Sequence, residues 1–153
     1  MTADKNNFSI STDKLKLDLP VIHNFLSHTY WSENISFETV QKSIEGSMCF
    51  GVYDNGNQAL PAGKQVGFAR MVTDNATFAY LADVFIIEEY RGRGLSKWLM
   101  EFILAHPDLQ GLRRILLATK DAHSLYKQFG FMPLNNPERF MHIHNPDIYK
   151  NAE

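Results

Sequence analysis

A glycine-rich turn at residues 90–96 (YRGRGLS) combines two glycines with two arginines, between an apolar segment and an amphipathic one. Gly92 and Gly94 let the main chain bend tightly and approach a ligand without a Cβ atom in the way. If a helix begins here, its first N–H groups have no acceptor within the helix, and its dipole adds partial positive charge. Arg91 and Arg93 add full positive charges. The pattern is typical of a phosphate site, although the same turn also occurs as a plain connection.

The spacing of the two glycines excludes the common nucleotide-binding motifs. A P-loop has four residues between its glycines and then Lys-Ser or Lys-Thr, whereas only Arg93 separates Gly92 from Gly94. The dinucleotide fingerprint Gly-x-Gly-x-x-Gly also fails, because Lys97 occupies the place of its third glycine. No second β-α-β half follows that would hold a dinucleotide. Phosphate groups bound at this turn would therefore belong to another kind of ligand.

Asp83 is the first candidate for acid–base chemistry. It interrupts residues 78–87, an otherwise almost wholly apolar and aromatic segment. Strand alternation predicts that it shares a face with Leu81, Phe85 and Ile87. A carboxylate in that setting needs a hydrogen-bond partner, water or a cation. Asp83 is therefore either a general base or amine anchor, or a structural acceptor at a β-bulge.

Tyr126 is the candidate proton donor, because a phenol with a pKa near 10 is protonated at neutral pH. Taken alone, it also fits a core tyrosine on a short helix. His123 lies one helical turn earlier and could share a face with it, although a surface or capping role suits a histidine here as well. Glu88 and Glu89 are further carboxylates, which we expect in a solvated loop.

Hydrophobic spacing predicts the elements that must position these residues. Strands are expected at residues 8–12, 48–53, 65–72, 78–87 and 114–118, with short closing strands at 131–134 and 140–143. Helices are expected from residue 19, from 36 to 44, from 95 to before 107, and from 122 to 129. Asp18 and Ser36 are suited to cap the first two helices, and residues 55–57 (NGN) indicate a turn. The order β-α-α-β-β-β-α-β-α-β indicates the α+β class, with a mixed α/β sheet.

Length and composition fit one domain covering residues 1–153. Hydrophobic residues make up 44% of the chain and charged residues 21%, and the net charge of -2 provides no basic field for nucleic acid. Cys49 is the only cysteine, so we expect a small core residue in a reducing compartment. Neither a signal peptide nor a run of about 18 apolar residues is found, which predicts a cytoplasmic protein without a membrane partner.

Three blocks of sequence together resemble the GNAT superfamily of N-acetyltransferases. Residues 91–96 (RGRGLS) resemble its acyl-CoA signature Arg/Gln-x-x-Gly-x-Gly/Ala, with Ser96 as a small departure in the last place. Residues 83–90 (DVFIIEEY) resemble the strand that precedes this loop. Residues 122–131 (AHSLYKQFGF) resemble the family segment Ala-x-x-Leu-Tyr-x-x-x-Gly-Phe. The resemblance covers roughly residues 46–131.

The resemblance implies where acetyl-CoA would bind. Main-chain groups of residues 85–87 would pair with the pantetheine arm like an added strand, and amides of residues 91–96 would hold the pyrophosphate. Thr119 stands where many relatives have an asparagine that contacts the cofactor. The implied cofactor-binding set is Phe85, Ile86, Ile87, Arg91, Gly92, Arg93, Gly94, Leu95, Ser96, Thr119 and Tyr126. The implied fold is a mostly antiparallel, twisted sheet of about six to seven strands flanked by about four helices.

The reaction that the resemblance implies is acetyl transfer from acetyl-CoA to a primary amine of a small molecule or, less readily, of a peptide or protein. The amine must first lose its proton, because an alkylammonium with a pKa near 10.4 has no free lone pair. Direct attack in a ternary complex needs no covalent enzyme intermediate and no metal. Tyr126 then acts as the acid toward the leaving sulfur and Asp83 as base or amine anchor, unless a water chain takes the proton.

The same residues leave the acceptor and other classes of function open. The acceptor cleft is expected to include Tyr30, Trp31, Arg70, Tyr80 and His123. Tyr30 and Trp31 either present an aromatic wall to a cationic amine or close the turn between the first two helices. Because dimers are usual in the family that the sequence resembles, we expect a homodimer. The alternatives are a non-catalytic acyl-CoA-binding sensor, which the presence of Tyr126 and Asp83 disfavours, and an α+β interaction domain whose turn binds nothing.

Overall fold

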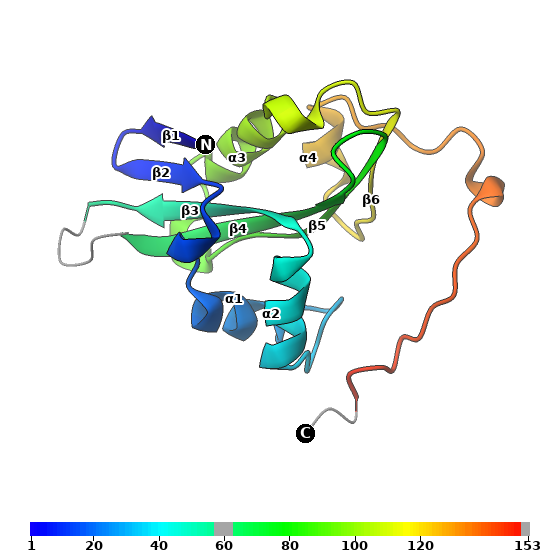
Figure 1. Cartoon of the computed structure of the whole chain (residues 1–153), viewed down its shortest axis with the longest axis horizontal. Coiled ribbons are helices and arrows are strands. Elements are labelled where there is room, and N and C mark those ends of the chain that lie inside the picture. Colours follow the sequence, from blue (N-terminus) through cyan, green and yellow to red (C-terminus); the bar gives the residue numbers. More distant parts are fainter. Residues whose placement is uncertain (57–62, 151–153) are drawn as a thin grey trace.

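One twisted sheet organises the chain in a computed structural model that describes residues 1–56 and 63–150. Within these residues, six strands lie in the order β1-β2-β3-β4-β5-β6 (Figure 1). Their bounds are Thr2–Lys5 for β1, Phe8–Ser11 for β2, Met48–Asp54 for β3, Lys64–Thr73 for β4, Phe78–Ile86 for β5 and Arg114–Leu117 for β6. Neighbouring strands are antiparallel except β5 and β6, which run parallel.

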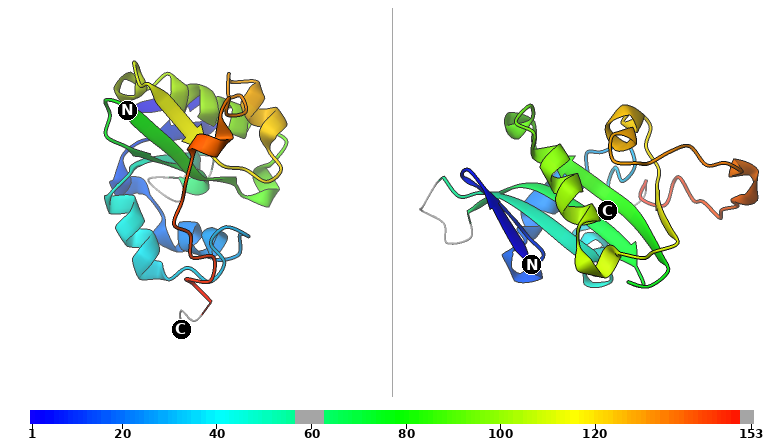
Figure 2. Two further views of the ribbon diagram at one scale, coloured as in Figure 1. Left: turned by 90° about the vertical axis from the view of Figure 1, so that its right-hand side faces the viewer. Right: turned by 90° about the horizontal axis from the view of Figure 1, so that it is seen from above.

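Helices cover both faces of this sheet (Figure 2). The α-helices are α1 (Leu19–Leu26), α2 (Phe37–Glu45), α3 (Leu95–Leu104) and α4 (His123–Lys127). Short 3-10 helices are η1 (Lys14–Lys16), η2 (Glu88–Tyr90), η3 (Pro107–Leu109) and η4 (Pro137–Arg139). The α1 and α2 pair packs on one face, and α3 packs on the other. Asp18 and Ser36 cap α1 and α2, because their side chains accept the N–H groups of Val21 and Thr39.

The predicted α+β class and single mixed sheet are confirmed, with six strands and four α-helices among the described residues. The strands expected at 48–53, 65–72, 78–87 and 114–118 correspond to β3, β4, β5 and β6 within one or two residues. Strand β1 was not predicted from the sequence, because its residues lack an apolar alternation. The turn expected at residues 55–57 lies partly outside the described residues, since position 57 is not described.

The predicted closing strands at residues 131–134 and 140–143 are wrong. These residues form no strand, and the helix expected at 122–129 is limited to α4. A strand needs a neighbour with which to exchange main-chain hydrogen bonds, and the C-terminal segment runs away from the sheet instead (Figure 1).

Two apolar clusters fill the space between the sheet and its helices. The larger, between the sheet and α3, includes Phe50 and Leu99; the smaller, between the sheet and α1 with α2, includes Phe68 and Phe85. Cys49 belongs to the smaller cluster and is 2% exposed. Burial raises the pKa of its thiol to about 11. In residues 1–56 and 63–150, no helix has the length and apolar content of a membrane span, and no group of three potential metal ligands is found.

Candidate active site

The free edge of β5 is the first feature of the candidate site. Strand β5 extends from Phe78 to Ile86, yet β6 pairs only with Phe78–Leu81. On the opposite side β4 stays paired with β5 as far as Ile86, which lies opposite Gly67. Among the described strands, none therefore borders the β6 side of β5 beyond Leu81. An extended ligand with amide groups can pair with such an edge as a further strand does.

The glycine turn continues from this edge to the start of α3. Gly92 and Gly94 have φ angles of +80° and +76°, a left-handed conformation that favours glycine. A Cβ atom at either position would meet nothing within 4 Å, so the turn is open to a ligand. The N–H of Trp98 donates to the Gly94 carbonyl (3.1 Å), and the amides of Leu95–Lys97 precede the first turn of hydrogen bonds. The turn therefore presents free amides and a helix N-terminus to anions.

Both arginines of the turn are held by neighbouring groups. Arg91 Nε donates to the Ile86 carbonyl at 3.0 Å, and the Arg93 guanidinium lies 4.8 Å from the centre of the Tyr90 ring. The Tyr90 hydroxyl donates to Asp54 Oδ2 at 2.7 Å. This hydrogen bond, and then the Gly56 N–H, hold the pKa of the Asp54 carboxyl below its ordinary value. The turn is thereby fastened to the end of β3.

A β-bulge positions Asp83. The pairs Phe68–Phe85 and Arg70–Ala82 leave one β4 residue opposite two residues of β5, and Asp83 has a φ angle of +55°. The bulge reverses the alternation of side chains along β5. Leu81 consequently packs toward α3, while Phe85 packs toward α1 and α2. The prediction that Asp83 shares one face with Leu81 and Phe85 is therefore wrong for Leu81.

Both carboxylate oxygens of Asp83 accept hydrogen bonds. Arg70 Nε donates to Oδ2 at 2.9 Å, and Trp31 Nε1 donates to Oδ1 at 3.0 Å. Arg70 also donates through Nη1 to Ser47 Oγ at 3.0 Å. The side chain of Asp83 is 11% exposed, so this ion pair is largely withdrawn from water. We call these four residues, Trp31, Ser47, Arg70 and Asp83, the Asp83 network.

The loop between α1 and α2 reaches across to β5 and to the segment that follows β6. Tyr30 and Trp31 pack edge to face, with ring centres 5.0 Å apart, and both rings are exposed. The Tyr30 hydroxyl accepts the N–H of Lys120, which follows β6, and the Lys120 ammonium lies 5.4 Å from the Tyr30 ring centre. The loop thus connects the bulge of β5 to the segment after β6. Tyr80, on β5 opposite Val72, is partly exposed.

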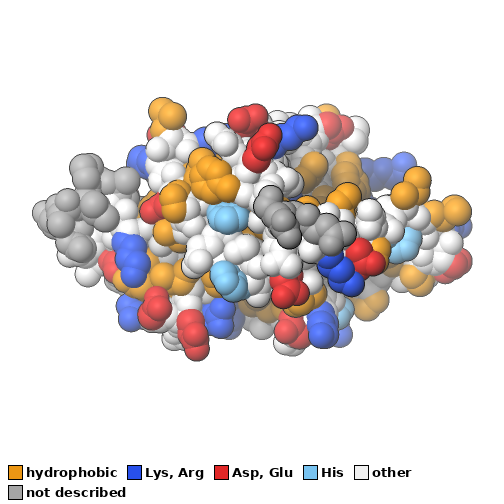
Figure 3. Space-filling view, turned by 90° about the horizontal axis from the view of Figure 1, so that it is seen from below, with side chains coloured by type: hydrophobic (Ala, Val, Ile, Leu, Met, Phe, Trp, Pro, Cys, Tyr) orange, Lys and Arg blue, Asp and Glu red, His pale blue; other side chains and the backbone are white. Residues whose placement is uncertain are grey.

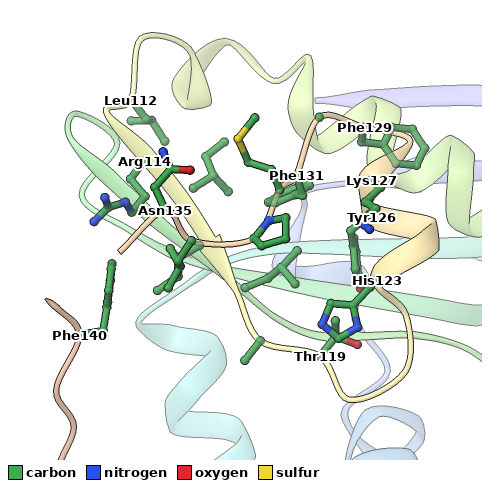
Figure 4. Close-up of a pocket in the computed structure, with 18 of the residues that line it drawn as sticks. Leu112, Arg114, Thr119, His123, Tyr126, Lys127, Phe129, Phe131, Asn135 and Phe140 are labelled. Atoms are coloured by element: carbon green, nitrogen blue, oxygen red, sulfur yellow. The ribbon is translucent and has the colours of Figure 1, made fainter. Parts of the chain in front are cut away.

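Tyr126 lines a cavity of about 860 Å³ beside β6. We call this cavity the β6 groove; it is bounded by β6, by α4 and by residues 129–136. Figure 4 shows Thr119, His123 and Tyr126 along one side of it. Tyr126 is 9% exposed, and burial raises the pKa of its phenol, which therefore stays protonated. The hydroxyl of Thr119 accepts the Ala122 N–H at 3.0 Å, so this side chain supports the turn before α4.

The comparison with known proteins identifies the family. A model described as an acetyltransferase (GNAT) domain matches residues 45–133. The chain belongs to the GNAT acetyltransferase family. The matched range contains the glycine turn, Asp83 and Tyr126. The GNAT family implies acetyl-CoA as co-substrate, and both the free edge of β5 and the open glycine turn fit such a ligand.

Individual GNAT relatives agree with this assignment. A candidate acetyltransferase of Gibberella zeae is 31% identical over 138 residues, which cover 80% of this chain and 77% of the relative. A crystal structure of a candidate acetyltransferase of the GNAT family from Xanthomonas campestris is 46% identical, with a TM-score of 0.88, and covers 97% of this chain and 100% of its own. A candidate acetyltransferase of Deinococcus radiodurans shares the fold at 17% identity, with a TM-score of 0.72 over 100% of this chain and 99% of its own.

Several residues of the candidate site were not predicted from the sequence. Asp54 ends a strand before an Asn-Gly turn and gives no sign that it holds Tyr90. Ser47 precedes β3 as an ordinary loop residue, and Lys120 contacts Tyr30 across 90 positions of the chain. His123, by contrast, is exposed on α4 as a surface histidine would be. Contacts between distant side chains leave no local signal in one sequence.

Proposed function

We propose that this protein transfers the acetyl group of acetyl-CoA to a primary amine of a small molecule, by direct attack in a ternary complex. The observation that carries the proposal is the continuity between the free edge of β5 and the free amides of the glycine turn. An extended amide-containing arm and a pyrophosphate are the two parts that such a surface fits. Peptide and protein amines are the less favoured acceptors.

Acetyl-CoA would be held mainly by main-chain groups. The main chain at residues 85–87, where β5 ends, would pair with its pantetheine amides, and the amides of residues 91–96 would receive its pyrophosphate. Arg93 adds charge beside the phosphates, while Arg91 also holds the carbonyl of Ile86 in place. Thr119 would shape the nearby turn through its hydrogen bond to Ala122. When bound, acetyl-CoA supplies a thioester carbonyl for the amine to attack and a thiolate as leaving group.

Tyr126 is the proposed acid of this reaction. Its phenol is buried, and burial disfavours the phenolate, so the proton remains available for donation to the departing sulfur. Such donation contributes about 10²–10⁴-fold to the rate of acyl transfer. His123, on the same face of the β6 groove, is proposed to contact the acceptor.

Asp83 is proposed to orient the amine end of the acceptor. Each carboxylate oxygen already accepts one hydrogen bond, from Arg70 or Trp31, and a carboxylate can accept further ones. With both oxygens engaged by protein donors, Asp83 is better suited to hold a group in place than to carry a proton away. We therefore assign removal of the amine proton to water, with Asp83 fixing the direction of approach.

The exposed aromatic rings and the ion pair between Arg70 and Asp83 favour a small acceptor. Tyr30 and Trp31 are exposed beside Asp83, and Tyr80 lies on the same strand. Since Arg70 balances the charge of Asp83, the rings contribute more to binding a cationic group than the carboxylate does. We propose that the reaction takes place in the cytoplasm, in keeping with a single, buried cysteine.

The test is a screen of primary amines with acetyl-CoA, in which release of the CoA thiol is measured. At least one primary amine should release thiol above the rate of hydrolysis, and its tertiary counterpart, which has no N–H to lose, should not. Mass spectrometry of the product should show one added acetyl group. If calorimetry shows CoA binding while no amine from a broad panel accelerates thiol release, the transferase proposal fails.

The alternative is a non-catalytic acyl-CoA-binding module. The engagement of both oxygens of Asp83 favours it, because a residue that is already paired contributes less to turnover. Such a module would bind acetyl-CoA and CoA without transfer to any amine. If the folded protein bound neither acetyl-CoA nor CoA at millimolar concentration, both the transferase and the non-catalytic binding module would be excluded.

A further inference from the structure

The guanidinium of Arg70 is held on two sides and still has hydrogen-bond donors to spare. Its Nε donates to Asp83 Oδ2 at 2.9 Å, and its Nη1 donates to Ser47 Oγ at 3.0 Å. Ser47 is itself fixed, because its hydroxyl donates to the Ser43 carbonyl at 2.7 Å. Within residues 1–56 and 63–150, Nη2 donates to no acceptor. A guanidinium carries more N–H groups than these two partners accept, so Arg70 presents an oriented and unused donor edge.

This donor edge adjoins the carboxylate that we propose to orient the amine. Nη2 is bonded to the same carbon atom as Nε, and Nε lies 2.9 Å from Asp83 Oδ2. The side chains of Arg70 and Asp83 are 18% and 11% exposed, so part of the ion pair is open to solvent. Each Asp83 oxygen accepts one hydrogen bond and can accept another. The pair therefore offers a ligand N–H donors and carboxylate lone pairs side by side.

The side chains that meet at this pair carry more positive than negative charge. Tyr30 and Trp31 join the pair to Lys120, whose ammonium lies 5.4 Å from the centre of the Tyr30 ring. Arg70 and Lys120 thus bring two positive charges, and Asp83 brings one negative charge. Over the face that carries α1 and α2, acidic and basic side chains are interspersed with hydrophobic ones (Figure 3). The charge of an acceptor is therefore read by these few side chains and not by a broad field.

An acceptor that carries only an amine fits these charges poorly. Its ammonium would be attracted by Asp83 but repelled by Arg70 beside it, and a lone carboxylate would meet the reverse. A molecule that carries both groups a few bonds apart satisfies both members of the ion pair and adds no net charge. An α-amino acid has this arrangement, since its amine and its carboxylate are attached to one carbon atom.

We propose that the acceptor is an α-amino acid, an inference that rests on the transferase function proposed above. The Nη2 group of Arg70 would bind its carboxylate, and Asp83 would orient its amine. The exposed rings of Tyr30 and Trp31 would contact its side chain. Arg70 is then the residue that determines which amines are accepted.

The products of this reaction are an N-acetyl amino acid and CoA. The ammonium gives one proton to water, the amine nitrogen forms a bond to the acetyl carbonyl carbon, and the C–S bond of the thioester breaks. The sulfur takes a proton from Tyr126, and the proton that the new amide nitrogen loses restores the phenol. The product keeps the carboxylate but has lost the ammonium, so it faces Asp83 without a compensating positive charge. This repulsion favours product release.

The first test compares matched acceptors on the wild-type protein. A panel of common α-amino acids is assayed with acetyl-CoA beside the corresponding α-carboxamides and decarboxylated amines, and release of the CoA thiol is measured. For the amino acids that react, kcat/KM should exceed that of both counterparts by about 10- to 100-fold, the range for one hydrogen bond to a charged group. The amine of a carboxamide is less basic and loses its proton more readily, so a preference for the acid reflects the carboxylate. Calorimetry with CoA in place of acetyl-CoA should show the same order of affinities without turnover.

The second test changes this preference through one residue. Arg70→Gln leaves Asp83 uncompensated, so kcat/KM should fall at least about tenfold for the amino acids and stay level or rise for the decarboxylated amines. Lys42→Gln is the matched control, because it removes the same charge from an exposed position on α2, and it should keep the wild-type preference. A purely structural role for Arg70 would lower both classes of acceptor equally. If urea titration showed that Arg70→Gln does not fold, Arg70→Lys, which keeps the charge but not the planar fork, should lower the preference in the same direction.

The outcomes separate this inference from the function on which it rests. If the wild-type protein acetylated decarboxylated amines as fast as their amino acids, the amino-acid acceptor would be overturned and the transferase function would stand. Equal losses for both classes of acceptor in a folded Arg70 variant would contradict the role of Arg70 in specificity. Binding of CoA without acetylation of any acid, amide or amine would overturn both proposals.

Discussion

The glycine turn and the Asp83 network lie at opposite ends of the same short stretch of chain, and they are built by different means. The turn presents main-chain amides, and its glycines leave open space around them. The Asp83 network consists of side chains from four separate segments, which meet at one bulge of β5. The first surface depends on the path of the backbone, whereas the second depends on contacts among particular side chains.

This difference predicts that the two surfaces respond differently to substitution. A main-chain surface tolerates changes in most side chains, provided that the glycines keep their positive φ angles. The Asp83 network changes whenever one of its members changes, since each group satisfies another. Substitutions in the turn should therefore affect CoA, and substitutions in the network should affect the acceptor and the stability of the fold.

The largest effect is expected for Gly94→Glu. The new carboxylate would stand where we propose that the phosphates of acetyl-CoA bind, and at about 4 Å and an effective dielectric constant of about 20, each like-charge pair costs about 4 kcal/mol. CoA affinity should fall by at least about 10³-fold, as measured by calorimetry. The matched control is Gly111→Glu, because Gly111 also has a positive φ, +72°, and open surroundings but lies before β6. Equal losses in both variants would mean that backbone strain, and not phosphate binding, is being measured.

Tyr126→Phe should have the next largest effect. Loss of the phenolic proton should lower kcat by about 10²-fold or more while CoA affinity stays nearly constant. Steady-state kinetics with an acceptor from the amine screen and calorimetry with CoA separate the two quantities. Tyr53→Phe is the control, because within the described chain the buried Tyr53 hydroxyl has no hydrogen-bond partner. An unchanged kcat in Tyr126→Phe would remove this residue from the proposed chemistry.

Asp83→Asn should change acceptor binding and stability together. Asparagine keeps the shape of the side chain but leaves the Arg70 guanidinium without its charged partner. We expect the free energy of unfolding to fall by about 1–2 kcal/mol and the acceptor KM to rise by about tenfold, with CoA affinity unchanged. Urea titration and steady-state kinetics measure the two effects. A collapse of kcat without loss of stability would instead identify Asp83 as the base.

Trp31→Phe should have the smallest effect of this series. It removes the hydrogen bond from Nε1 to Asp83, but keeps an aromatic ring at a position that is 43% exposed. The acceptor KM should rise by about two- to fivefold, equivalent to roughly 0.5–1 kcal/mol, and kcat should stay the same. Tyr30→Phe, which removes the hydrogen bond to the Lys120 N–H, is the companion variant. If either variant lost CoA affinity, the two surfaces would not be separate.

The sequence predicted the glycine turn well because its signal is local. Glycines, arginines and the following amphipathic helix are adjacent in the chain, and α3 begins at Leu95 as expected. The caps of α1 and α2 were likewise predicted from single residues, Asp18 and Ser36. Physical rules that connect neighbours within a few residues can be applied to one sequence without any knowledge of the fold.

The sequence failed where the structure depends on distant contacts. The bulge at Asp83, which the sequence offered only as one alternative, changes which face the β5 residues occupy, so strict period-two alternation placed Leu81 on the wrong face. The segment at 140–143 has the alternation of a strand but forms no strand. The pairing of Asp83 with Arg70 and Trp31 joins residues 13 and 52 positions apart, and no spacing rule predicts such contacts.

The burial of Cys49 has a practical consequence for the assays that measure the release of the CoA thiol. A thiol with a raised pKa that is closed off in the small core cluster is a poor nucleophile toward colorimetric thiol reagents. The folded protein should therefore add almost no background while free CoA accumulates. A sudden gain in reagent-reactive sulfhydryl from the protein itself would then report unfolding, so one absorbance trace can follow both product formation and the integrity of the enzyme.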